Sequence, residues 1–417
     1  MKRLLYILLV VFLFLSLGVR AQEERKKELL RELAESPGDT TRLNILYELS
    51  VVTKYQPLVR VYYLDQLIKE ADKQKNDFFK CQVYLNRIFM AYNSLDAPAL
   101  HYWFSLLEPL TRKNNYYDLQ FQGKRCVIDF FQLSGEYEKE ERESKLLLYE
   151  AEKAGSVIGM VVAIQSLGNA YIVTYRDEEA LAAYEKAYAL SCKIGNPALT
   201  LEIIHSVTEV VQKIKDYPKW LKYIKLEESC INESIRHSKV NFSLPSCILM
   251  MYIHYMAYYT TVGDIDMAKY YYQLADNTYH MLPEAALYRE YYARASSDYL
   301  RKSGQYEKAL AQVDTLMRLF HPVSALNYNT AFEERAEILH LMGRDAEALD
   351  LLKVAKKRRD SLQIELLNTQ TEQVKSIHDV YLLQQEKDCN YRYLQVIIIS
   401  FLVVSIITIT VFIIYTY

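Results

Sequence analysis

Apolar residues between positions 164 and 187 recur at intervals of three and four, which is the spacing of an amphipathic helix. The pattern is interrupted once, at the polar turn 175–177, where Asp177 is suited to cap the helix that follows. Two short helices joined by a turn are therefore predicted. The residues that share a face are Ile164, Leu167, Gly168 and Tyr171 in the first helix and Ala180, Tyr184 and Ala187 in the second.

The same hairpin pattern recurs along most of the chain at nearly equal intervals. Turn glycines stand at Gly263, Gly304 and Gly343. The interval from Lys215 to Gly263 is longer than the others, and the extra length is predicted around 232–245. A single hairpin cannot bury its own apolar face, so stacked neighbours are expected. The predicted turns lie near residues 55, 95, 135, 175, 215, 263, 304 and 343.

The best hairpin resembles the tetratricopeptide repeat (TPR), whose pattern is Leu-Gly-x2-Tyr followed by an alanine, an aromatic residue and an alanine. Every position is filled, by Leu167, Gly168, Tyr171, Ala180, Tyr184 and Ala187. The resemblance implies an all-α fold, a right-handed superhelical solenoid of about eight hairpins over residues 22–355. Arg60, Leu100 and Glu140 depart from the pattern, because a small alanine is expected there. The period is longer than that of the usual repeat, so helices about a turn longer are expected.

Both ends of the chain carry apolar segments of another kind. Residues 1–21 combine a basic start, a 14-residue apolar run and small residues, the pattern of a cleaved secretory signal peptide. Residues 394–415 are 22 uncharged residues that span roughly 33 Å as a helix, which predicts a transmembrane helix. Between them, residues 356–393 are predicted to form a long connecting helix with a weak coiled-coil pattern, and residues 416–417 a short cytoplasmic end.

Composition narrows the classes of function. The formal net charge is −2, and it becomes −5 when residues 1–21 are removed, because 47 basic residues then face 52 acidic ones. This balance is too close to neutral to favour nucleic acid binding. The 37 tyrosines are interpreted mainly as packing residues between helices.

No catalytic constellation is recognisable in the sequence, so neither an enzyme nor a cofactor is predicted. The eight histidines are never three or four residues apart, so no single helix face offers a two-histidine metal site. The cysteines form no CxxC motif and suit small apolar positions. Cys230 and Cys247 flank the irregular segment 232–245, and a disulfide between them is a hypothesis for an oxidising compartment.

TPR-like arrays offer a groove lined by the first helix of each hairpin, and the resemblance implies a protein or peptide partner there. Peptide-carboxylate-binding members of the family use a lysine and an asparagine at two groove positions. Asn169 matches, but Gln165 replaces the lysine, so carboxylate-clamp binding is not supported. The candidate groove residues are Gln165, Asn169, Tyr291, Arg294, Asp298 and Arg301.

The whole layout resembles bacterial membrane regulators in which periplasmic TPR repeats precede a cytoplasmic histidine kinase or helix-turn-helix output. It implies a single-pass protein of the bacterial inner membrane, with the array in the periplasm acting as the sensor half of a signalling system. The alternative is a membrane-tethered scaffold for envelope protein assembly that transmits no signal. A homodimer is compatible with an apolar seam in the connecting helix, made of Leu367, Val374, Ile377 and Tyr381.

Overall fold

The computed structural model describes residues 23–36, 38–54, 56–133, 135–236, 244–282, 285–320 and 325–361. Within these ranges all regular structure is helical, as the all-α prediction requires. The predicted signal peptide at 1–21 and the predicted transmembrane helix at 394–415 both lie outside the described residues. Among the helices that are described, none is long and apolar enough to cross a membrane.

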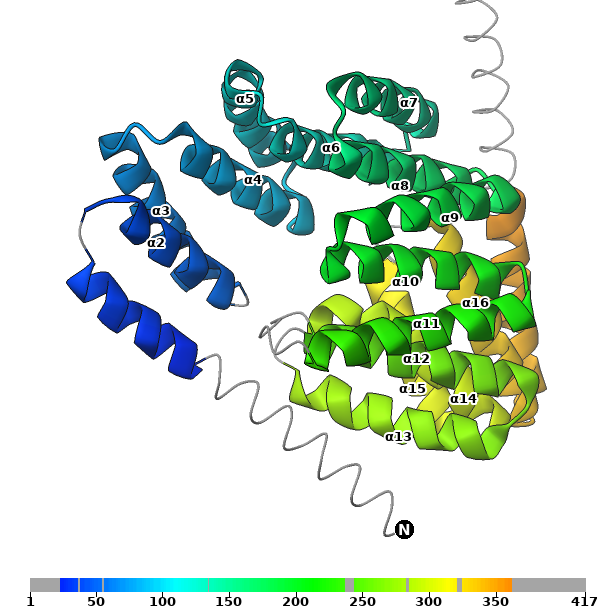
Figure 1. Cartoon of the computed structure of the whole chain (residues 1–417). Helices are drawn as coiled ribbons and strands as arrows, with labels where there is room; N and C mark the ends of the chain where they lie inside the picture. The colour runs from blue at the N-terminus through cyan, green and yellow to red at the C-terminus, as the bar shows by residue number, and fades with distance from the viewer. Residues whose placement is uncertain are drawn as a thin grey trace, which may run out of the picture. The chain divides into compact units, whose positions relative to one another are not determined.

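The helices follow one another in pairs along the chain (Figure 1). Residues 23–35 form a first helix, and a last helix covers the described residues 345–361. The elements between them are α2 (Thr40–Val52), α3 (Pro57–Lys73), α4 (Asp77–Asn93), α5 (Ala97–Asn114), α6 (Tyr117–Leu133), α7 (Tyr137–Ala154), α8 (Val157–Val173), α9 (Asp177–Ile194), α10 (Pro197–Lys213), α11 (Tyr217–Arg236), α12 (Leu244–Val262), α13 (Ile265–Met281), η1 (Ala285–Tyr288), α14 (Arg289–Lys302), α15 (Tyr306–Phe320) and α16 (Ala325–Leu341). All eight predicted turns fall between paired helices, so the hairpin prediction is confirmed.

A left-handed residue recurs at regular intervals through the middle of the array, once after each helix. Its φ angle lies between 53° and 74° at Lys75, Leu95, Asn115, Gly135, Gly155, Tyr175, Gly195 and Lys215. This conformation lets amides beyond the helix end bond the last carbonyls. After α8, for example, the Arg176 amide donates to the Tyr171 carbonyl at 2.9 Å. One helix with its turn is therefore the unit of the array, and two such units make one period of the sequence pattern.

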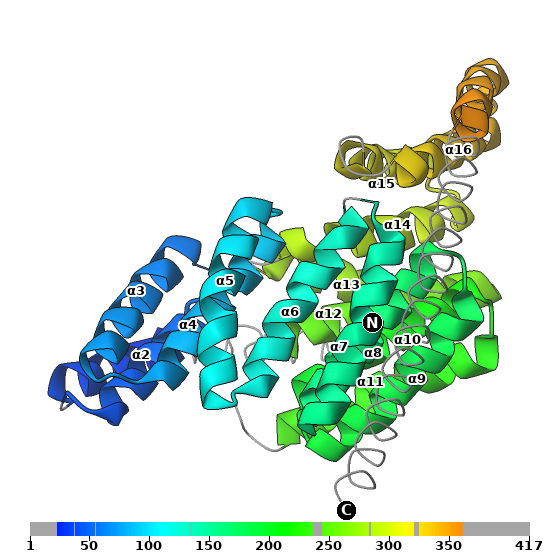
Figure 2. The same cartoon turned by 90° about the horizontal axis from the view of Figure 1, so that it is seen from above.

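The small positions of the repeat lie where helices approach closely. Ala180, Ala187 and Ala268 are fully buried. Gly168 of α8 faces Tyr184 of α9, and a Cβ atom placed there would lie only 2.7 Å from Cζ of that ring. Helix α8 packs against α6, α7 and α9, so each hairpin covers the apolar faces of its neighbours (Figure 2).

Two of the three positions that depart from the repeat pattern are nevertheless part of the interior. Leu100 and Glu140 are completely buried, and Arg60 is half-buried and donates to the side chain of Asn86. The larger residues are therefore accommodated in the hairpins that lack alanine at this position. Glu140 is unusual, because neither of its carboxyl oxygens has a hydrogen-bond partner among the described residues.

The regular period ends beyond α11. That helix extends to Arg236 and α12 begins at Leu244, so the longer interval falls where the sequence predicted it. The proposed Cys230–Cys247 disulfide is not supported, because both residues are free thiols in the structure. Further on, the 3₁₀ turn η1 precedes α14, which is shorter than the helices of the regular hairpins.

The chain divides into two compact units, residues 1–348 and 349–417. The division falls slightly before the predicted end of the array at residue 355. Of the second unit the structure describes residues 349–361, which are helical and contain the first six positions of the predicted connecting helix. The rest of that helix, with its apolar seam, lies outside the described residues.

Gly168→Ala should destabilise the array by about 1–3 kcal/mol, because the new methyl group overpacks the contact with Tyr184. Chemical denaturation of the purified protein measures the free energy of unfolding. Gly38→Ala is the matched control, since a Cβ atom there would lie 3.9 Å from its nearest neighbours. The cost of Gly168→Ala should shrink in a Tyr184→Leu background; an equal cost in both backgrounds would contradict this contact.

Glu140→Gln should remove a pH-dependent loss of stability. Burial, and secondarily the charge of Asp129, raise the pKa of Glu140 to about 8. The folded state therefore binds more protons than the unfolded state between about pH 4.5 and 8, so stability falls as pH rises through this window. The variant should match the parent near pH 4 and exceed its unfolding free energy at pH 9 by about 1–3 kcal/mol. Denaturation curves at both pH values, with Glu136→Gln as an exposed control, check this; parallel pH profiles would refute it.

Candidate binding surfaces of the array

The inner face of the first unit is defined here as the side of the first helices α6, α8, α10, α12, α14 and α16 that carries the predicted groove residues. Side chains on this face reach across an intervening helix. Arg125 of α6 contacts Glu202 of α10 at 3.0 Å, and Gln165 of α8, between them, donates to the same carboxylate oxygen at 3.0 Å. These contacts bring polar side chains of α6, α8 and α10 together on one side of the array, and the predicted groove itself stays a prediction.

The first two predicted groove residues are held by partners within the array. Gln165 is nearly fully buried, and its amide is bonded to Glu202. Asn169 accepts a hydrogen bond of 2.6 Å from the Tyr184 hydroxyl, so the repeat tyrosine fixes it within its own hairpin. A ligand could reach the Gln165 Nε2 donor or the Asn169 Oδ1 acceptor only by breaking these bonds, whereas Gln165 Oε1 is buried with no hydrogen-bond partner among the described residues.

The other four candidates lie together on α14 and form a mostly paired charge network. Tyr291 lies near Glu209 of α10, and the charge of that carboxylate raises the pKa of Tyr291. Arg301 contacts Asp298 at 3.1 Å and also pairs with Glu337 of α16. Arg294 lies 3.3 Å from Glu290 and 3.9 Å from Glu334.

A buried polar cluster connects α6 to α8 and α10. Asp129 is 3% exposed and accepts hydrogen bonds from Ser166 and from Arg125 Nε, the latter at 3.0 Å. Burial raises the pKa of Asp129 more than the guanidinium lowers it. Burial also opposes the charge of Glu202, yet the Arg125 guanidinium outweighs it and lowers the pKa of Glu202. The positive charge of Arg125 is thus shared between two carboxylates on separate helices.

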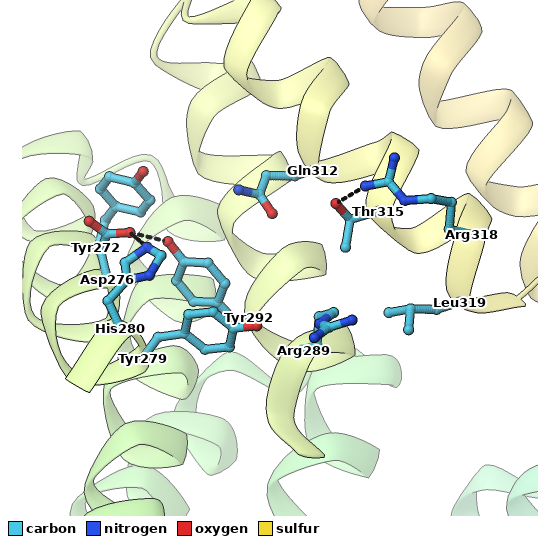
Figure 3. A pocket seen from close by; sticks show the side chains of 10 residues that line it. All are labelled: Tyr272, Asp276, Tyr279, His280, Arg289, Tyr292, Gln312, Thr315, Arg318 and Leu319. Carbon is cyan, nitrogen blue, oxygen red and sulfur yellow. Dashed lines mark hydrogen bonds and ion pairs between the residues drawn. The ribbon is translucent and has the colours of Figure 1, made fainter. Parts of the chain in front are cut away.

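A pocket of about 500 Å³ opens on the other side of α14, between α13 and α15 (Figure 3). Helix α13 contributes Tyr272, Asp276, Tyr279 and His280, helix α14 contributes Arg289 and Tyr292, and helix α15 contributes Gln312, Thr315, Arg318 and Leu319. The short α14 explains the opening, because η1 replaces the helical turns that would otherwise pack along α13.

One wall of the pocket is aromatic. The rings of Tyr279 and Tyr292 stack with centroids 4.3 Å apart and an angle of 11° between their planes. The Tyr292 hydroxyl donates to Asp276, which His280 also approaches at 3.4 Å (Figure 3). The stacked rings and the shared carboxylate together fix this wall.

The charges of the pocket are not balanced. Asp276 is the one carboxylate among the described residues that line it, and it is already engaged by Tyr292 and His280. Arg318 donates to the neutral Thr315 hydroxyl at 3.0 Å. Neither Arg318 nor Arg289 forms an ion pair with a carboxylate in the described part of the chain. Two exposed guanidinium groups therefore line the pocket, and Arg318 lies across it from the stacked tyrosines (Figure 3).

Sequence reasoning missed both this pocket and a cluster of His205, Glu227 and His254. The pocket residues share faces of α13 and α15, but that spacing is also what packing between helices requires. The cluster escaped detection because its members come from α10, α11 and α12, so their sequence spacing carries no signal. Burial opposes the charge of His205, but the Glu227 carboxylate outweighs it and raises the pKa of His205 to about 10.

Neither a protein-family model nor a curated protein matches the chain. Solved structures do. A Rap protein complexed with Competence and Sporulation Factor is 12% identical over 87% of this chain and 99% of its own, with a TM-score of 0.52. Aspartyl phosphate phosphatase F from Bacillus subtilis is 13% identical over 84% of this chain and 91% of its own, with a TM-score of 0.51.

A third solved structure is a signal transduction ATPase with a tetratricopeptide repeat sensor from Pyrococcus horikoshii. It is 15% identical over 84% of this chain and 54% of its own, with a TM-score of 0.46. At such identities only the fold is shown. The described chain has the fold of a TPR-like helical-repeat array. This fold agrees with the repeat residues, the eight hairpins and the contact between Gly168 and Tyr184.

Proposed function

We propose that the array binds a protein or peptide partner through an acidic group of that partner, which enters the pocket between α13 and α15. The observation that carries the proposal is the pair Arg289 and Arg318, which line the same pocket as the stacked tyrosines and have no carboxylate partner in the described part of the chain. Guanidinium groups suit carboxylates and phosphates because their donors match two oxygens at once. The tyrosines add apolar contact area at low entropic cost.

The inner face is the second candidate surface for this partner. Its charged groups are largely paired with one another, so a ligand there gains affinity only by exchanging existing bonds for new ones. Arg294 and Asp298 remain half-exposed and supply recognition of a polar ligand. Helix α14 joins the two surfaces, since Tyr291 faces Glu209 on the inner face and Tyr292 lines the pocket.

The fold also supports a binding role. Stacked helical hairpins present extended surfaces on rigid elements, which suits recognition of a partner chain. One of the structures with this fold was solved as a complex of a Rap protein with Competence and Sporulation Factor, which illustrates that use in another protein.

The setting we propose is the bacterial inner membrane, with the array in the periplasm as the sensor half of a signalling system. What supports this is the sequence pattern of residues 1–21 and 394–415. In this proposal the connecting helix pairs with that of a second copy and carries the signal. The alternative is a membrane-tethered scaffold for envelope assembly, in which the connecting helix acts as a tether alone.

Photo-crosslinking in cells tests the pocket. A photoreactive residue at Gln312 should capture a partner, and Arg289→Glu with Arg318→Glu should reduce that product by tenfold or more, because charged hydrogen bonds are worth about 1.5–3 kcal/mol each. Mass spectrometry of the products identifies the partner. Arg142→Glu on α7 is the matched control for charge reversal, because its side chain is 72% exposed.

A second photoreactive position, in place of Tyr291, separates the two surfaces. The pocket is supported as the site of the acidic group if capture from position 312 depends on the two pocket arginines and capture from position 291 does not. The proposal would be wrong if positions 312 and 139 captured the same products and charge reversal left those products unchanged. Lys139 is the comparison position because its side chain is 41% exposed.

Disulfide cross-linking in membranes distinguishes the sensor from the scaffold. Single cysteines at Val374 and Ile377, in a background without the native cysteines, should cross-link efficiently, because both lie on the predicted seam. A cysteine at Lys375 is the control, since it lies off the seam. Equal or absent cross-linking at all three positions would favour the monomeric scaffold.

A further inference from the structure

Three consecutive helices bring His205, Glu227 and His254 together near the middle of the array. The Nδ1 atom of His205 in α10 lies 3.0 Å from Oε1 of Glu227 in α11. The Nδ1 atom of His254 in α12 lies 2.8 Å from Oε2 of the same carboxylate. One donor atom from each of the three residues lies within 4.8 Å of the other two. The cluster is independent of the pocket, which lies on α13, α14 and α15.

The cluster is withdrawn from solvent. The Glu227 side chain is fully buried, the His254 side chain is 4% exposed, and the His205 side chain is 18% exposed. A carboxylate buried to this degree needs compensating positive charge, and transferring it from water alone is very costly. The modest exposure of His205 leaves one side of the cluster within reach of a water molecule or a small ion.

Protons alone do not satisfy this arrangement. His205 Nδ1 and Glu227 Oε1 lie close together, but they are not aligned as a hydrogen bond, and both lack another partner in the described part of the chain. Nε2 of His254 is also buried without a hydrogen-bond partner there. Buried polar atoms in native proteins are nearly always paired, so three such atoms within one cluster require an explanation.

We propose that His205, Glu227 and His254 form a site for a divalent transition metal, with Zn²⁺ as the best fit. Two imidazoles and one carboxylate are a donor set that zinc uses, at about 2.0–2.2 Å from the metal. Donor atoms around a tetrahedral zinc ion lie roughly 3.3 Å apart at these bond lengths, so the three side chains need only small movements. A water molecule takes the fourth coordination position, from the side where His205 is exposed.

The surroundings of the cluster suit a dication. The Cys247 thiol lies near enough to His205 to raise the pKa of that histidine, although Glu227 has the larger effect. The carboxylate of Glu209 lies near enough to feel the charge of both histidines. Glu227 supplies one negative charge among the ligands, and the two histidines are neutral when they bind a metal.

The role that follows for the metal is structural. It ties α10, α11 and α12 together across the interval where the regular period is broken. Because the site is assembled by the fold and absent from the unfolded chain, the metal binds the native state and stabilises it.

Zinc titration of the chelator-treated full-length protein in detergent tests the proposal. Isothermal calorimetry should show one equivalent of Zn²⁺ bound, and the ion should raise the melting temperature. His205→Ala, His254→Ala and Glu227→Gln should each weaken zinc binding at least tenfold and abolish the thermal shift. His101→Ala and His340→Ala are matched controls, because both histidines are exposed and lie outside the cluster.

Cobalt substitution gives a readout that does not depend on stability. Co²⁺ should produce the visible absorption of a tetrahedral nitrogen–oxygen site in the parent and in the two control variants, and this absorption should be lost when a ligand is replaced. Circular dichroism confirms that each variant is folded, and His254→Gln replaces His254→Ala if the latter is not. If the folded parent binds no equivalent of Zn²⁺ and gives no cobalt spectrum, the cluster is an ordinary buried ion triad and the proposal is wrong. Zinc binding that is unchanged in all three ligand variants would also overturn it.

Discussion

A single helix as short as α8 is marginal in water on its own, and in this chain each such helix is stabilised by the helices that follow and precede it. From α3 to α10, the reversal of direction depends on one left-handed residue at the end of each helix, which lets the next amides bond the last carbonyls of that helix. Where that residue is Leu95, Tyr175 or Lys215, the backbone accepts a conformation that disfavours a side chain. Those turns persist because the stacking on either side outweighs the local cost.

The regular unit of one helix and one turn explains why the sequence predicts the fold well and the sites poorly. Turn positions, helix lengths and the Gly168–Tyr184 contact are set by residues close together in one hairpin, so periodicity reveals them. Residues such as Arg125 and Glu202 are brought together only by the stacking of several hairpins, and nothing in their spacing marks the pair. The pocket is harder still, because it results from the shortening of α14 by η1 rather than from a motif.

Buried polar groups give this array a registry that apolar stacking alone does not supply. Apolar contacts are not directional, whereas the buried Asp129 carboxylate, which pairs with Arg125, reaches the buried Ser166 hydroxyl in only one arrangement of α6 and α8. Such pairs add little net stability, because desolvation offsets most of the attraction between the charges. Their contribution here is to penalise the wrong stacking, since a misplaced helix leaves a buried charge without a partner. Glu140 is the opposite case, because its buried carboxyl group has no hydrogen-bond partner in the described chain. Its ionisation is expected to lower the stability of the folded state.

The same reasoning separates recognition from structure among the charged residues. A charge that is already paired within the array must give up that bond before it can hold a ligand, so the inner face contributes more to selectivity than to affinity. A charge without an internal carboxylate partner loses little when a ligand arrives, and Arg289 and Arg318 are in that position beside a rigid aromatic wall. Helix α14 is held on one side by the ion pair of Arg301 with Glu337 of α16 and on the other by the hydrogen bond from Tyr292 to Asp276 of α13. An acidic group that takes the Tyr292 hydroxyl from Asp276 would therefore act on a helix whose opposite side carries residues of the inner face.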